Sequence, residues 1–187
     1  MKKLILCAAV VIAAMGANAQ KAKSDSKSTP KSQFSIGVEG SLPIGDFAKA
    51  YSFGFGGSVQ GDFWVAPELA LTANVGYISY SGKSVTTTYT AGTTTVSTTT
   101  KYPSNGLVPV LAGIKYKFGG SMVYASAQLG AAFSTQSGGG SSFAYAPGIG
   151  FNFSPNFDAL LKYQGYSSKG GNTSSAVGLR LAYTLGH

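Results

Sequence analysis

Seven charged side chains lie on one side of the alternating apolar segments of this 187-residue chain. They are three acids and four bases: Glu39, Asp62, Lys115, Lys117, Asp158, Lys162 and Arg180. Buried charges are stable only when they are paired and hydrogen-bonded, so this set predicts an internal network of salt bridges and water. Because the bases outnumber the acids by one, we expect an ordered water or an anion to complete the network. The alternative is a gate, in which a switch of partners opens a narrow path for water or small ions.

Side chains that could carry catalysis or bind a metal are scarce. The only histidine is the C-terminal His187, and the only cysteine is Cys7, close to the N-terminus. The many serine and threonine hydroxyls therefore lack a base that could activate them. A metal site would need a second histidine or an acidic cluster. The sequence predicts no enzyme, no catalytic or metal-binding residue and no cofactor.

A threonine-rich segment, residues 82–104, is the other candidate for molecular contacts. Threonine has a high strand propensity, and Gly92 can adopt the positive φ of a tight turn. The segment predicts a protruding hairpin that includes Val85, Thr87, Tyr89, Gly92, Thr94, Val96 and Thr98. The edge of such a hairpin can pair with another protein, or its surface can bind glycans. The alternative is a flexible, solvated loop.

The elements that position these residues are eight segments with a period of two. In the last one, large apolar residues such as Leu179 and Leu181 alternate with small or polar ones such as Gly178 and Arg180. This period is typical of β-strands, and each segment is long enough to cross a bilayer at a tilt. The predicted strands are 33–43, 53–65, 69–81, 106–118, 121–133, 143–154, 157–167 and 174–185.

The side on which the charges lie decides between a soluble fold and a membrane fold. All seven charges oppose the apolar rows, whereas a soluble barrel or sandwich would place them outside around an apolar core. A charge on the lipid face near the midplane costs roughly 2–4 kcal/mol. We therefore predict an all-β fold, an eight-stranded antiparallel up-and-down transmembrane β-barrel. A secreted, lipocalin-like carrier conflicts with the inward charges.

The connections between the predicted strands alternate in length. Those at 66–68, 119–120 and 154–156 are tight, whereas those near 44–52, 82–105, 134–142 and 168–173 are long. Short periplasmic turns and long external loops are the rule in outer-membrane barrels, with both termini in the periplasm. The run Gly138-Gly139-Gly140 predicts flexibility in the third long loop.

The first residues predict export. Residues 1–19 are predicted to be a signal peptide, because Lys2 and Lys3 precede a short apolar stretch and Ala17-Asn18-Ala19 provides a small-x-small cleavage site. Residues 20–32 form a basic periplasmic linker, and residues 33–187 form the barrel. Removing Lys2 and Lys3 lowers the formal charge from +8 to +6. The basic excess could favour acidic lipid or glycan surfaces, but a solvated linker is the preferred interpretation. Nothing in the pattern predicts nucleic-acid binding.

Three stretches carry a resemblance to known barrels: the leader end ANAQ, the opening GVEGSLPIGDF (37–47) and the closing AVGLRLAYTL (176–185). The chain resembles small eight-stranded outer-membrane barrels of the outer membrane protein A/X type. It looks still more like the "outer membrane protein beta-barrel" family common in Bacteroidota. The last strand, with Gly178, Leu181 and Tyr183, resembles the signal read by the barrel-assembly machinery.

The resemblance implies a monomer in the outer membrane of a Gram-negative cell, in contact with its lipid. We expect a non-enzymatic surface barrel that contributes to envelope integrity, or to adhesion through its long external loops to a surface protein or glycan. The alternative function is a porin-like narrow channel for water or small solutes through the charged lumen.

Overall fold

The computed structural model describes residues 32–92, 94–119, 121–168, 170–171 and 173–185. The predicted signal peptide (1–19), almost all of the predicted linker (20–32) and His187 lie outside these residues.

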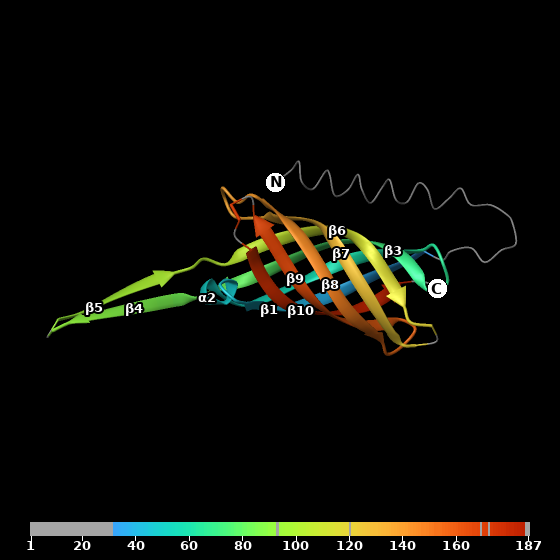
Figure 1. Cartoon of the computed structure of the whole chain (residues 1–187), viewed down its shortest axis with the longest axis horizontal. Coiled ribbons are helices and arrows are strands. Elements are labelled where there is room, and N and C mark those ends of the chain that lie inside the picture. The colour runs from blue at the N-terminus through green and yellow to red at the C-terminus, as the bar shows by residue number, and fades with distance from the viewer. Residues whose placement is uncertain (1–31, 93, 120, 169, 172, 186–187) are drawn as a thin grey trace, which may run out of the picture.

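Eight antiparallel strands of the described chain form one closed barrel (Figure 1). Their order around the wall is β1-β10-β9-β8-β7-β6-β3-β2, and β1 closes the barrel by pairing with β10. The strands are β1 (Ser32–Ile44), β2 (Tyr51–Trp64), β3 (Leu69–Gly82), β6 (Asn105–Lys117), β7 (Val123–Ser134), β8 (Ser141–Asn152), β9 (Phe157–Ser168) and β10 (Thr173–Leu185). The all-β, eight-stranded prediction is confirmed, and the strand ends differ from the predicted ones by at most two residues.

The pleat sorts side chains between the outside and the lumen. On the outside, large apolar residues stand exposed, and Leu129 and Ile149 are 60% and 64% accessible. On the inside, small and polar residues are buried, as at Ser126 and Gln128 on either side of an outward Ala127. A wall with apolar residues outside and polar residues inside is stable only where the outer face meets lipid.

The two ends of the barrel differ in their connections. At one end, the turn end, β2–β3, β6–β7 and β8–β9 are joined by a few residues each, and β10 finishes there (Figure 1). At the other, the hairpin end, the β1–β2 connection contains a four-residue helix, α2 (Phe47–Ala50), which the sequence patterns did not predict. No helix in the described part of the chain has the length and hydropathy needed to cross a membrane.

A separate two-stranded sheet projects from the hairpin end, well beyond the barrel wall (Figure 1). It consists of β4 (Ser84–Ala91) and β5 (Thr94–Lys101), which pair in register from Ser84–Lys101 to Ala91–Thr94. Gly92 follows β4 with a φ of 61°, which suits the first central position of a type I′ hairpin turn.

Candidate functional site

One cluster of lumen charges is centred on Glu39 of β1. Lys162 Nζ lies 2.8 Å from Glu39 Oε2, and Arg180 Nε lies 4.0 Å from Glu39 Oε1. Arg180 also donates to Ser58 Oγ at 2.9 Å and to Ser35 Oγ at 3.0 Å, and its side chain is fully buried. The cluster therefore joins four strands, with two bases around one acid.

A second cluster contains the other two acids. Lys115 Nζ lies 2.9 Å from Asp62 Oδ2, and Gln60 Nε2 donates to Asp62 Oδ1 at 2.7 Å. Asp158 accepts a hydrogen bond from the Tyr124 hydroxyl. Lys115 Nζ also lies 4.2 Å from the centre of the Tyr124 ring, so that this tyrosine links the two carboxylates.

Gly150 makes room for Tyr124 in the lumen. A Cβ on Gly150 would lie 2.0 Å from a carbon of the tyrosine ring, so no larger residue fits on β8 beneath it.

Lys117, the seventh predicted residue, is not brought into either cluster. Its Nζ lies 4.2 Å from the centre of the Trp64 ring, and Trp64 Nε1 donates to Gln33 Oε1 at 3.1 Å. Lys117 is only partly buried, near the turn end. Because the Lys117 charge lies on an aromatic face instead, the two clusters contain equal numbers of charges, three acids and three bases.

Uncharged side chains connect the wall across the rest of the lumen. Gln128 Nε2 donates to Gln60 Oε1 at 3.1 Å and to Thr72 Oγ1 at 3.0 Å. Nearer the hairpin end, Ser41 Oγ donates to Gln164 Oε1 at 2.8 Å. Inward side chains thus fill the interior, as an eight-stranded barrel allows, and this arrangement does not favour the alternative of an open channel.

An apolar cluster closes the lumen at the hairpin end. Phe47 of α2 is buried there, with its ring centre 4.9 Å from that of Tyr80 and 4.8 Å from that of Tyr51. Further members of the cluster include Ile78, Leu107, Leu111 and Tyr166. The sequence interpretation missed Phe47 because it belongs to no strand; a large apolar residue in the otherwise polar GDFAK stretch was the available signal.

The hairpin β4–β5 has two different faces. On one, hydroxyls pair across the strands: Thr86–Thr99 at 2.9 Å, Thr88–Ser97 at 3.0 Å and Thr90–Thr95 at 3.4 Å. The predicted contact residues fall in the alternating positions, with backbone pairs Val85–Thr100, Thr87–Thr98, Tyr89–Val96 and Ala91–Thr94. Tyr89 is 70% exposed and Val85 39%, so this second face offers apolar surface to solvent.

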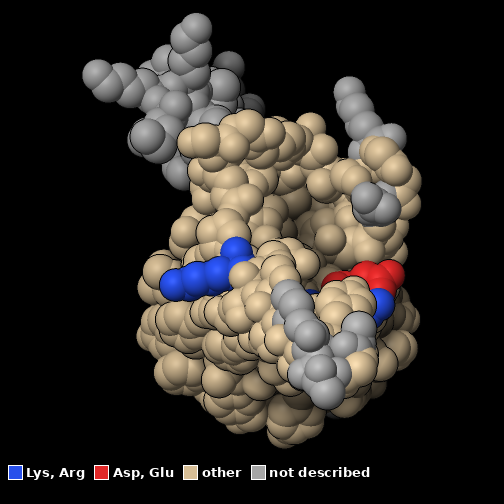
Figure 2. All heavy atoms as spheres, turned by 90° about the vertical axis from the view of Figure 1, so that its left-hand side faces the viewer, with Lys and Arg blue, Asp and Glu red and all other residues tan. Residues whose placement is uncertain are grey.

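Among the described residues, few charged side chains are visible on the face at the hairpin end (Figure 2). Lys49 Nζ lies 2.7 Å from Asp46 Oδ1 on the surface, and the ammonium group holds the pKa of this carboxyl below its usual range. Lys83 Nζ donates to Ala48 O at 2.8 Å, which ties the base of the hairpin to α2.

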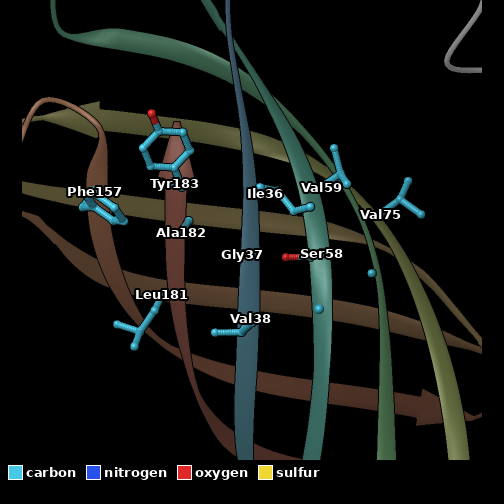
Figure 3. A pocket seen from close by; sticks show the side chains of 12 residues that line it. Ile36, Gly37, Val38, Ser58, Val59, Val75, Phe157, Leu181, Ala182 and Tyr183 are labelled. Atoms are coloured by element: carbon cyan, nitrogen blue, oxygen red, sulfur yellow. The ribbon is translucent and has the colours of Figure 1, made fainter. Parts of the chain in front are cut away.

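The outer wall carries a shallow apolar furrow across β10, β1, β2 and β3 (Figure 3). Ile36, Val38, Val59, Leu181 and Tyr183 stand around it, and its volume is about 710 Å³. A surface of this composition suits the acyl chains of lipid.

Aromatic rings gather on the outer wall towards both ends. Near the turn end, Phe34 packs edge-on against Phe63, and the ring centres of Phe157 and Tyr183 lie 4.9 Å apart. Nearer the hairpin end, Tyr145 lies 6.0 Å from Tyr163. Two belts of this kind mark the two interfaces of a bilayer.

Within the described part of the chain, no group of three or more His, Cys, Asp or Glu side chains could hold a metal ion. The geometry and the wall composition define the class: a small transmembrane β-barrel with a filled, polar lumen. Residues 5–184 match the model of the family described as "Outer membrane protein beta-barrel domain", and the chain belongs to this family. It is an outer-membrane β-barrel protein, as the resemblance implied.

Solved structures show the same fold at low sequence identity. The chain is similar to the attachment invasion locus protein Ail of Yersinia pestis in a nanodisc, with a TM-score of 0.55, 17% identity and coverage of 83% of this chain and 100% of that one. The structure of Ail in complex with the heparin analogue sucrose octasulfate matches with a TM-score of 0.52 and 19% identity, and the match covers 84% of this chain and 99% of that one. The N-terminal barrel domain of Pseudomonas aeruginosa OprF matches with a TM-score of 0.51 and 15% identity, and the match covers 82% of this chain and 97% of that one. No curated protein matches the sequence.

Proposed function

We propose that this protein is a non-enzymatic surface barrel that attaches the cell to an extracellular protein through the β4–β5 hairpin. The observation that carries the proposal is the projection of this hairpin beyond the barrel wall (Figure 1). Long connections face outward in outer-membrane barrels, which supports an external hairpin end with the turn end in the periplasm. In the same proposal, residues 1–19 are removed on export and 20–32 remain as a periplasmic linker.

The strand edges of the hairpin favour a partner that adds a strand. In the described chain, β4 and β5 pair only with each other, so each has an outer edge. A two-residue turn closing on Ala91–Thr94 makes that pair hydrogen-bonded, and the bonded pairs then alternate along the ladder. The N–H groups of Thr88 and Ser97 accordingly point to the outer edges, where an extended segment of another protein can accept them.

The exposed face can supply specificity to this contact. Tyr89 and Val85 are solvent-exposed apolar side chains next to the β4 edge. Tyrosine gives a large amphipathic contact with little loss of rotamer freedom, which suits a recognition surface. The name of Ail, the attachment invasion locus protein, associates that protein with attachment, and its barrel is similar to this one.

The described residues lack two side-chain types that commonly take part in nucleophilic catalysis. They include no histidine or cysteine, and no hydroxyl among them has a histidine beside it to act as a base.

The test is adhesion of a non-adherent Gram-negative strain that displays the protein, measured on mammalian cell monolayers. We expect deletion of residues 84–100 to abolish adhesion while the barrel keeps its heat-dependent gel shift. Thr88→Pro and Ser97→Pro remove one edge N–H each, and Thr88→Ala and Ser97→Ala are their matched controls. At least one proline variant should weaken adhesion although its alanine control does not.

Two results would contradict the proposal. Unchanged adhesion after the deletion would exclude the hairpin as the attachment element. Adhesion that depends on the hairpin but tolerates both prolines would exclude strand addition and favour a glycan held by side chains.

A further inference from the structure

A small pocket opens at the mouth of the barrel, beside the apolar cluster and away from the hairpin faces. This mouth pocket has a volume of about 250 Å³. Phe47, Leu107 and Tyr166 line its apolar side, and Ser134, Ser142 and Ser174 contribute hydroxyls. It therefore combines a fixed apolar floor with a polar rim.

The floor belongs to the apolar cluster that closes the lumen. Phe47, Leu107 and Tyr166 are 8%, 8% and 5% exposed, respectively. The Phe47 ring is held against Tyr80, and Leu107 lies on a barrel strand paired on both sides. A ligand entering the mouth would meet an apolar surface that is already in place.

One side of the rim is the third long loop, which contains the three glycines and makes hydrogen bonds with the residues at the start of β6. Gly139 N donates to Gln136 O at 2.9 Å, Gln136 Nε2 donates to Ser104 O at 3.0 Å, and Thr135 N donates to Gly106 O at 2.8 Å. A Cβ on Gly139 would lie 2.5 Å from Ser134 Oγ, so the close approach of this loop to the strand requires glycine. The glycines thus form a tight turn tied to β6.

Two hydroxyls of the rim, those of Ser142 and Ser174, are open to a ligand, and the described side chains around them are uncharged. Within the described chain, no hydrogen bond engages the hydroxyl of Ser142 or Ser174, whereas Ser134 Oγ donates to Asn105 Oδ1 at 3.1 Å. None of the described residues that line the pocket is a lysine, arginine, aspartate or glutamate. A charged ligand would lose hydration there without gaining an opposite charge.

We propose that the mouth pocket binds one ring of a neutral sugar. A pyranose has an apolar C–H face that can lie on Phe47 and Tyr166, and hydroxyls that can bond to Ser142 and Ser174. Its volume is below the roughly 300–1,000 Å³ of sites for drug-sized ligands, which limits the occupant to about one ring. This site is separate from the proposed strand edges, so the two proposals stand independently.

The test is saturation-transfer NMR on the full barrel in lipid nanodiscs, free of sugar detergents. The probes are the methyl glycosides of glucose, galactose, mannose and N-acetylglucosamine. We expect transfer to the ring protons of at least one of them. Ser142→Leu fills the pocket and should weaken that binding about tenfold or more. Ser84→Leu, the same substitution on the exposed hairpin, should leave it unchanged.

Specific outcomes would overturn the proposal. No transfer to any neutral glycoside from the folded wild-type barrel would do so, as would equal binding by a folded Ser142→Leu variant. Sucrose octasulfate serves as the charged probe: if its binding depended on Ser142, the pocket would be selective for anions instead.

The sugar could belong to a foreign glycan or to the polysaccharide of the same cell. Competition of the bound methyl glycoside by neutral oligosaccharides of mammalian glycans, or by delipidated polysaccharide of the native strain, distinguishes these sources. Displacement of the methyl glycoside by either competitor supports a sugar site. If neither competitor displaces it, the result contradicts a role of the mouth pocket in binding surface polysaccharides.

Discussion

At the scale of single residues, burial separates two ion pairs of nearly equal length. Lys162 and Glu39 meet at 2.8 Å with both side chains 3% exposed, whereas Lys49 and Asp46 meet at 2.7 Å with 80% and 89% exposed. A solvated pair contributes little because water and salt screen it. A buried acid between two bases matters far more, because its removal leaves their charges uncompensated.

We therefore expect Glu39→Gln to lower the free energy of unfolding by about 3–5 kcal/mol, the cost of breaking a buried pair. Urea unfolding in lipid vesicles measures this. Asp46→Asn is the exposed control and should change little, since Asp46 makes no capping hydrogen bond with its side chain. Adding Lys162→Met to Glu39→Gln should restore part of the loss. Equal effects of Glu39→Gln and Asp46→Asn would contradict the role of burial.

The alternation of apolar and polar residues predicted that the seven charged side chains face the lumen. It could not predict which side chains they contact there. Which strands face each other across the lumen depends on strand tilt and stagger, which no single segment contains. Lys117 illustrates the limit, since its partner is the Trp64 ring rather than a carboxylate. Tyr124, the partner of Asp158, could have been found as a large aromatic residue on the inward side of β7.

At the scale of elements, the hairpin depends on its turn residue. Gly92 has a φ of 61°, and a β-branched residue there is strained by about 1–3 kcal/mol. We expect Gly92→Val to speed amide exchange across β4 and β5 without changing exchange in the barrel. Gly170→Val is the control, because Gly170 is exposed and a Cβ there meets no atom within 4 Å. Unchanged exchange in the Gly92 variant would show that the turn does not hold the hairpin.

The outer faces of the strands lead to a second prediction at this scale. Leu129, in the middle of β7, is 60% exposed on the outer wall. Leu129→Arg should destabilise the barrel in vesicles by about 2–4 kcal/mol, because it places a charge in hydrocarbon. Thr98→Arg, on the exposed hairpin, should be close to neutral. Unfolding of Leu129→Arg at the same urea concentration as Thr98→Arg would contradict a lipid-facing position for Leu129.

The strands could be predicted closely because each carries its own period-two pattern. The short elements could not be. Helix α2 has only four residues, and Phe47 is held by contacts with Tyr51 and Tyr80 from β2 and β3. The turn at Gly139 depends on Ser104 and Gly106, which lie more than thirty positions earlier in the chain.

At the scale of the whole molecule, the filled lumen separates the two functions considered from the sequence. Polar networks cross the interior, and the cluster around Phe47 closes the hairpin end. We expect purified barrels in planar bilayers to give no sustained conductance above that of the bare membrane. Reproducible single-channel steps from the wild-type protein would show that the lumen opens and would revive the channel hypothesis.

The central claim is that the barrel spans the outer membrane with its hairpin outside the cell. Labelling of single-cysteine variants on intact cells with a membrane-impermeant maleimide tests it most directly. The chain is suited to this because its only cysteine, Cys7, lies in the predicted leader. We predict that Thr87→Cys on the hairpin is labelled on intact cells, and Ser121→Cys at the turn end only after the outer membrane is permeabilised. Labelling of Ser121→Cys but not Thr87→Cys on intact cells would contradict the claim.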